Sequence, residues 1–147
     1  MRLALLTLVA LFLCAAAEAH VRITPAESRA GTTETYSARV PTEGKVTTAS
    51  VQLDVPDGVM IVSASAPPGV TYELKKDGDR IVAVVWTTAI KPGDSAMLSF
   101  VARNPKAGDN IVWKVHQRYA DATSSEWTGP AGSRGTAPVT KLIPSER

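Results

Sequence analysis

The chain has 147 residues and a formal net charge of +2, from 16 lysines and arginines against 14 aspartates and glutamates. Basic and acidic residues are interspersed and form no basic stripe, which excludes the usual electrostatic footprint of a nucleic-acid-binding protein. The length suits one domain of ordinary size with a single hydrophobic core.

The first 19 residues have the pattern of a signal peptide. Met1-Arg2 supplies a positive start, an apolar run extends from Leu3 to Ala17, and the small residues at 17 and 19 fit a signal-peptidase site. We therefore predict a signal peptide over 1–19, cleavage before His20, and one exported domain over 20–147 that is periplasmic or extracellular. The mature chain contains no apolar segment near the roughly 20 residues of a membrane helix, so no membrane span is expected.

The only cysteine, Cys14, lies inside the predicted signal peptide. The mature domain therefore has no disulfide, and it cannot form a blue-copper or thiolate zinc site, since both need a cysteine. An alternative is that Cys14 carries a lipid, although the bulky Phe12 and Leu13 before it fit a lipoprotein signal badly. In that case His20 would not become the amino terminus.

The mature sequence is typical of strands and turns. Ten glycines and ten prolines recur at short intervals and leave no room for a long helix. The alternation is clearest in 47–55, where Val51 and Leu53 share one face and Gln52 and Asp54 the other. About nine strands at this spacing predict an all-β fold, a two-sheet β-sandwich of the immunoglobulin or fibronectin kind. The predicted strands are 21–24, 34–40, 47–55, 60–65, 71–75, 80–87, 96–102, 111–119 and 139–143.

His20 has unusual chemistry if it becomes the first residue. A terminal histidine carries a free α-amine beside its imidazole, and the two nitrogens can bind one metal ion. The amine has a pKa of roughly 7.7–8.0, so it loses its proton to a metal far more easily than a backbone amide does. Nitrogen ligands of this kind suit Cu(II). The alternative is that a histidine simply happens to follow the cleavage site.

The other ligands of such a site are less certain from the pattern alone. The second histidine, His116, alternates with Lys114 and Arg118 and is expected on a charged, solvated face rather than at a metal. A site at His20 would then need an oxygen ligand. Glu43 is the best candidate because it follows a strand end, and Glu27 and Glu34 are competitors.

Trp127 lies in the polar segment Ser124–Pro130, which the sequence predicts to be a loop. A tryptophan there either closes the end of the core or covers a site, whereas Trp86 and Trp113 lie in apolar strands and are expected in the core. The chain has no nucleophile elbow, phosphate-binding loop or dinucleotide fingerprint, so we predict that it is not an enzyme.

Several segments together give the chain a family resemblance, and they keep their order over the mature domain. They are His20-Val21 with Pro25, Val40-Pro41-Thr42-Glu43, Pro68-Gly69-Val70, Val85-Trp86 with Pro92-Gly93, Gln117-Arg118-Tyr119 and Trp127-Thr128-Gly129-Pro130. In these the chain resembles the YcnI-like family of exported bacterial copper-binding domains. The resemblance implies a β-sandwich with a single-histidine brace, in which His20 binds Cu(II) through amine and imidazole, Glu43 supplies oxygen and Trp127 lies close to the metal.

The resemblance also implies a role. The protein is expected to hold copper outside the cytoplasm, in copper homeostasis or as a metallochaperone that hands the ion to other extracytoplasmic copper proteins. Two alternatives stay open at this point. One is a copper-dependent polysaccharide oxidase, which would need His116 as a second histidine. The other is a metal-independent interaction module built on the same sandwich.

Overall fold

The computed structural model describes residues 20–146, and every regular element among them is a strand. The predicted signal peptide and Cys14 lie outside the described residues. No helix among residues 20–146 is long and apolar enough to cross a membrane.

Twelve strands make up the described chain. They are β1 (Arg22–Thr24), β2 (Glu27–Arg29), β3 (Thr33–Pro41), β4 (Thr48–Asp54), β5 (Met60–Ser65), β6 (Thr71–Asp77), β7 (Arg80–Ile90), β8 (Ser95–Arg103), β9 (Asn110–Val112), β10 (Lys114–Tyr119), β11 (Ser124–Trp127) and β12 (Val139–Ile143).

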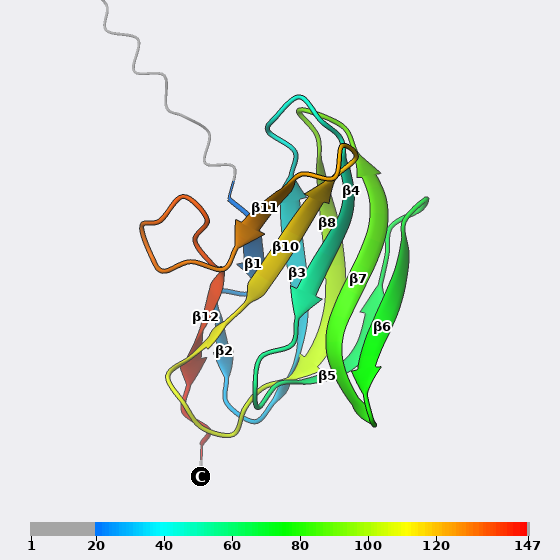
Figure 1. The fold of residues 1–147 in the computed structure, drawn as a ribbon. Coiled ribbons are helices and arrows are strands. Elements are labelled where there is room, and N and C mark those ends of the chain that lie inside the picture. Colours follow the sequence, from blue (N-terminus) through cyan, green and yellow to red (C-terminus); the bar gives the residue numbers. More distant parts are fainter. Residues whose placement is uncertain (1–19, 147) are drawn as a thin grey trace, which may run out of the picture.

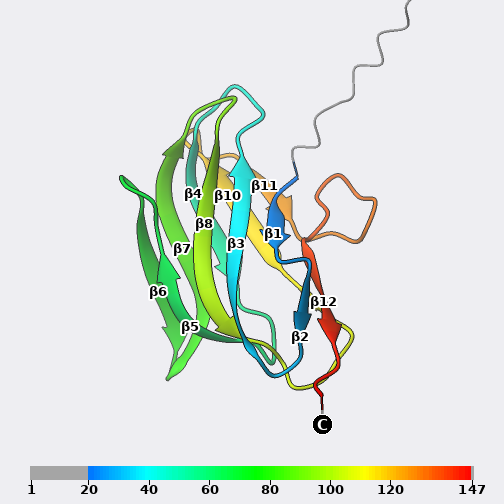
Figure 2. The same ribbon diagram turned by 180° about the vertical axis from the view of Figure 1, so that it is seen from behind.

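These strands form two facing antiparallel sheets and a small third sheet (Figures 1 and 2). The four-stranded sheet has the order β1-β3-β8-β5 and the five-stranded sheet the order β11-β10-β4-β7-β6. The third sheet, β2-β12-β9, contains one parallel pair, between β2 and β12. The predicted two-sheet all-β sandwich is therefore the observed architecture.

The core lies between the two large sheets and follows the alternation of the sequence. In β4, Val51 and Leu53 are buried while Gln52 and Asp54 face outward and are half-buried. Aromatic rings fill the centre: Phe100 packs at 5.4 Å from Tyr36 and at 5.3 Å from Trp113 between ring centroids. Trp86 and Trp113 are both fully buried, which confirms their expected place in the core.

The short strands differ from prediction. The sequence predicted one strand over 111–119, but it breaks at Trp113, whose backbone N–H donates to the carbonyl of Pro138 at 2.8 Å. The loop predicted around Trp127 is wrong, because Ser124–Trp127 forms β11 and pairs with β10. Such short polar segments become strands because a neighbouring strand supplies hydrogen-bond partners, which their own hydrophobicity does not signal.

The strand pairing also places the start of the described chain. β1 runs antiparallel to β3, with Arg22 opposite Arg39. The start of β1 therefore lies at the end of the sandwich where β3 leads into the connection to β4, as both views show (Figures 1 and 2). His20 precedes the first residue of this strand by two residues. The β3–β4 connection, residues 42–47, is the segment that carries Glu43.

Candidate metal centre

His20 and Trp127 come together in the structure. Their ring centroids are 5.5 Å apart, with the ring planes tilted by 57°. His20 precedes β1, an edge strand of the four-stranded sheet, and Trp127 ends β11, an edge strand of the five-stranded sheet. The two rings therefore meet where the two sheets border each other.

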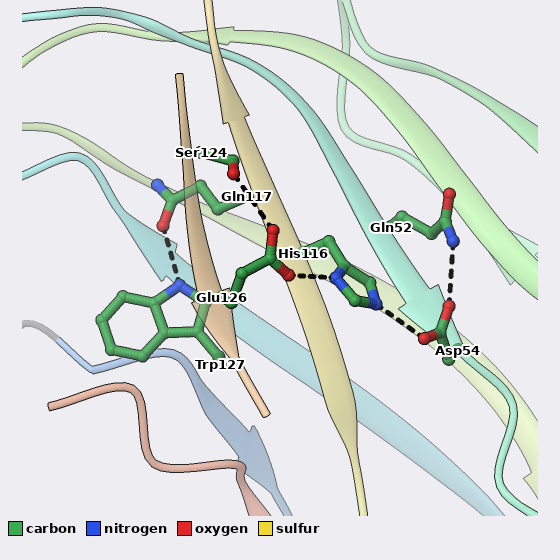
Figure 3. A network of polar contacts seen from close by, with 7 residues as sticks. All are labelled: Gln52, Asp54, His116, Gln117, Ser124, Glu126 and Trp127. Atoms are coloured by element: carbon green, nitrogen blue, oxygen red, sulfur yellow. Dashed lines mark hydrogen bonds and ion pairs between the residues drawn. The ribbon is translucent and has the colours of Figure 1, made fainter. Parts of the chain in front are cut away.

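Trp127 serves as part of the core and as a neighbour of His20. It is half-buried and packs against the hydrophobic cluster between the sheets. Its Nε1–H donates a hydrogen bond to Oε1 of Gln117 at 3.0 Å (Figure 3). Since the indole N–H is engaged there, it is the ring rather than the nitrogen that Trp127 presents to His20. Of the two roles considered from sequence, closing the core and covering a site, the geometry is compatible with both at once.

Glu43 lies in the β3–β4 connection, two residues after the end of β3. The β1–β3 pairing has Arg22 opposite Arg39. If this register is extended by two residues, His20 comes opposite Pro41, and paired Cα atoms of antiparallel strands are about 4.5–5.5 Å apart. Glu43 is exposed. The start of its loop is hydrogen-bonded to the turn 91–94: Thr42 N–H donates to Asp94 O at 2.9 Å, and Gly93 N–H donates to Thr42 O at 2.8 Å.

The competing carboxylates lie toward the other end of the strands. Glu34 is near the start of β3, seven residues before Pro41, which is a distance of about 23 Å along an extended strand. Its Oε2 accepts a hydrogen bond from Ser28 at 2.9 Å. Glu27 begins β2, beyond the end of β1 that lies away from His20. Of the three predicted oxygen donors, only Glu43 lies at the His20 end of the sandwich.

His116 faces the opposite way. On β10 it pairs with Glu126 of β11. The neighbouring pair along the two strands, Val115 and Trp127, points to the other side of the sheet and packs against the core. The Nε2 atom of His116 lies 2.6 Å from Asp54 Oδ2, and its Nδ1 contacts Glu126 Oε2 (Figure 3). The predicted face is correct, but His116 is half-buried and held between two carboxylates instead of lying free in solvent. Both of its ring nitrogens are engaged by these carboxylates.

The cluster around His116 shifts two pKa values. Burial alone would lower the pKa of His116, but its hydrogen bonds and charge interactions with Asp54 and Glu126 outweigh burial and raise it. For Asp54 burial would raise the pKa, but hydrogen bonds from Gln52 and His116, together with the charges of His116 and Lys114, lower it. The imidazolium can donate from both ring nitrogens at once, so both carboxylates are satisfied by the charged form.

Gln117 is the residue that sequence reasoning missed. It is fully buried, and besides accepting from Trp127 it donates from Nε2 to Pro41 O and to Thr48 Oγ1, each at 2.8 Å. The signal was available, because Gln117 occupies an inward position of an alternating strand, where Trp113 and Val115 are apolar. A buried glutamine at such a position needs partners for both ends of its amide.

The side chains at this end of the fold can be compared with the ligands that copper requires. Within residues 20–146 no group of three or more histidine, cysteine, aspartate or glutamate side chains could hold a metal ion. Among these residues, neither the imidazole of His20 nor the carboxylate of Glu43 makes a hydrogen bond or ion pair. One imidazole and one carboxylate at the same end of the fold make a metal site only if a further ligand joins them. A His20 with a free α-amine would supply such a nitrogen.

Comparison with known proteins gives the family. Residues 20–142 match the family model described as "Domain of unknown function (DUF1775)". The chain is also 34% identical, over 140 residues, to the "Copper-binding protein CutI" of Bacillus subtilis (strain 168), covering 93% of this chain and 69% of that protein. This protein belongs to the DUF1775 family, and the YcnI-like resemblance seen in the sequence is confirmed.

Solved structures support the fold. An uncharacterized protein from Nocardia farcinica, described as having an immunoglobulin-like fold, superposes with a TM-score of 0.73 at 23% identity, over 84% of this chain and 97% of that one. A non-cellulosomal cohesin from Archaeoglobus fulgidus superposes with a TM-score of 0.50 at 14% identity, over 84% of this chain and 90% of that one. At these identities the likeness concerns the fold alone, and it agrees with the immunoglobulin-like sandwich expected from sequence.

Proposed function

We propose that this protein, after cleavage between Ala19 and His20, binds one Cu(II) ion through the α-amine and imidazole of His20 and the carboxylate of Glu43. Trp127 lies beside the ion and limits access to it. The protein does no chemistry on the copper. It holds the ion outside the cytoplasm and passes it on, as a metallochaperone or copper-homeostasis factor.

The observation that carries the proposal is the contact between His20 and Trp127, at 5.5 Å between ring centroids. It is supported by the strand register that directs residues 42–47 toward the same end. It is also supported by the relative described as a copper-binding protein. Two nitrogens and one carboxylate suit Cu(II), whereas Cu(I) prefers sulfur ligands. A half-buried indole beside the site would reduce the access of water and of external reductants.

The orientation of His116 favours a binding protein over a copper oxidase. An oxidase of the polysaccharide-cleaving kind would need a second histidine at the metal. Both ring nitrogens of His116 are engaged by carboxylates on the outer face of the five-stranded sheet. The binding site would therefore hold a single histidine.

The test is a Cu(II) titration of two matched proteins. One begins at His20, with its native amine, and the other carries one extra alanine before His20, which converts the amine into an amide. We expect the extended protein to lose most of its Cu(II) affinity, since a backbone amide gives up its proton far less readily than an amine. Thermal unfolding of the metal-free proteins checks that the extra residue leaves the fold unchanged.

Equal affinity of the two proteins would overturn the histidine brace. If neither protein bound Cu(II) tightly, the alternative of a metal-independent interaction module would take its place. Mass spectrometry of the exported protein provides the complementary check, because a mature chain that begins at any residue other than His20 would contradict the proposal.

A further inference from the structure

A continuous hydrogen-bonded chain runs through the interior from Trp127 to the loop that carries Glu43. Trp127 Nε1–H donates to Gln117 Oε1 at 3.0 Å, and Gln117 Nε2 donates to Pro41 O and Thr48 Oγ1, both at 2.8 Å. Gln117 and Thr48 are fully buried. Pro41 ends β3 and Thr48 begins β4, so Gln117 contacts both ends of the connection 42–47.

The chain continues past Thr48 with a defined direction. Thr42 Oγ1 donates to Ile90 O at 2.9 Å and lies 2.6 Å from Thr48 Oγ1. A hydroxyl has one proton, so with that of Thr42 given to Ile90, Thr48 donates to Thr42 and accepts from Gln117. Every donor in the series thus points the same way, from the indole to the backbone of β7. Bonds aligned in this manner strengthen one another in a buried site.

An amide side chain satisfies both requirements of position 117. One end must accept from the indole N–H and the other must donate to a backbone carbonyl and a hydroxyl. These partners also fix which end of the amide is oxygen and which is nitrogen. Glutamate could accept from Trp127, but its second oxygen would face the carbonyl of Pro41 without a proton to share. Methionine has nearly the same length and supplies neither group.

We propose that Gln117 is a positioning residue for the copper site, because it fixes the indole of Trp127 and the loop of Glu43 relative to each other. This inference rests on the proposed function, since it assigns to Gln117 the alignment of a group on β11 and a group in the β3–β4 connection around His20. Gln117 itself does not touch the ion. Its effect on copper is indirect, through the two groups that it holds.

The experiment compares Gln117→Met with Gln52→Met, both beginning at His20. Gln52 is a half-buried glutamine of the same sheet that faces outward and donates to Asp54 at 2.9 Å, so it is a matched control. Cu(II) affinity is measured by competition with a chelator, and the Cu(II) electron paramagnetic resonance spectrum reports the geometry of the ligands. We expect Gln117→Met to bind Cu(II) roughly 10- to 100-fold more weakly with a changed spectrum, as for loss of outer-shell partners elsewhere. Gln52→Met should match the wild type in both measurements.

Thr48→Val gives a second, milder test. It removes the hydroxyl that Gln117 and Thr42 share but keeps the side-chain volume and the bond between Trp127 and Gln117. We expect a smaller loss of affinity than in Gln117→Met and again a changed spectrum. If Gln117→Met does not fold, Thr48→Val decides the matter.

The proposal is overturned if a folded Gln117→Met binds Cu(II) with wild-type affinity and an unchanged spectrum, or if Thr48→Val does so when Gln117→Met is unfolded. Its failure is distinguishable from failure of the proposed function. If blocking the amine of His20 abolishes binding but neither variant alters it, only the role of Gln117 is wrong. If blocking the amine has no effect, the histidine brace itself is wrong.

Discussion

The two histidines of this protein lie in opposite chemical surroundings although both are half-buried. The ring of His20 lies against Trp127, and within residues 20–146 its imidazole has no hydrogen-bond or ion-pair partner. Both ring nitrogens of His116 are engaged, one by Asp54 and the other by Glu126. The two residues therefore do not differ in exposure. They differ in the hydrogen-bond partners of their ring nitrogens.

The difference bears on what each histidine can do. A metal ligand must offer a neutral ring nitrogen, whereas two neighbouring carboxylates favour an imidazolium that has no lone pair to offer. Within residues 20–146 the imidazole of His20 is thus not engaged by a polar partner, and the region of His116 joins strands β10, β11 and β4 across the outer face of the sheet. Four predictions test this contrast.

Replacing each histidine by alanine should give opposite results in a Cu(II) titration. His20→Ala removes a direct ligand, so we expect the affinity to fall by more than the roughly 10- to 100-fold caused by loss of an outer-shell partner. His116→Ala should leave the affinity unchanged. Isothermal titration calorimetry on proteins that begin at residue 20 measures both. Loss of binding in His116→Ala with retention in His20→Ala would reverse the assignment.

Gly135→Ala should disturb both regions at once. A Cβ at position 135 would lie 2.2 Å from the backbone oxygen of Glu126. The side chain of Glu126 contacts His116, and that of the next residue, Trp127, contacts the ring of His20. The backbone must shift, and we expect the free energy of unfolding to fall by about 1–3 kcal/mol, as for other overpacked sites.

The matched control for that substitution is Gly44→Ala, where a Cβ would meet nothing within 4 Å. Its stability in chemical denaturation should equal that of the wild type. A Gly135→Ala protein as stable as Gly44→Ala would mean that the segment after β11 can move aside without cost.

Glu43→Gln should weaken Cu(II) binding by roughly tenfold, or about 1.4 kcal/mol, because an amide oxygen is a poorer ligand than a carboxylate. Stability of the metal-free protein should not change, since Glu43 is exposed and makes no ion pair within the described residues. Glu27→Gln is the comparison variant, with no expected effect. If Glu27→Gln weakens binding and Glu43→Gln does not, the wrong carboxylate has been chosen.

The smallest effect concerns pH and the region of His116. Its pKa is raised in the folded protein, so its stabilising contribution is complete below the unfolded value near 6.5 and is lost as the pH rises through the folded pKa. Asp54 has a lowered pKa, so its contribution is present above 3.8 and is lost as the pH falls through the folded pKa. Both contributions to stability are therefore present together between pH 3.8 and pH 6.5.

His116→Gln should remove the decline in stability above pH 6.5 that this residue causes. We expect a difference of at most about 1 kcal/mol, because the side chain is 35% exposed and such ion pairs are weakened by solvent. Urea unfolding of both proteins from pH 5 to pH 9 measures it. An identical pH dependence would show that the paired carboxylates do not favour the charged ring.

Much of the fold could be predicted because the long strands carry their pattern locally. In β3, β4, β7 and β8 the alternation of buried and exposed residues is visible within each segment. The short strands β2, β9 and β11 were missed or merged, because pairing with a distant strand defines them. The candidate site divides in the same way. The cleavage pattern points to His20, and the family resemblance implies Trp127. Gln117 was missed although it is a polar residue at an inward position of an alternating strand.

The period of the strands, the pattern that precedes His20 and the types of donor atom available are properties of short segments, so they could be predicted from the residues alone. Which of these residues meet depends on strand pairing between distant segments. His20 and Trp127 come from opposite ends of the described chain, and the pairing of β1 with β3 and of β10 with β11 brings them to one rim. The same pairing turns His116 outward and Gln117 inward, because neighbouring residues of a strand face opposite sides of its sheet.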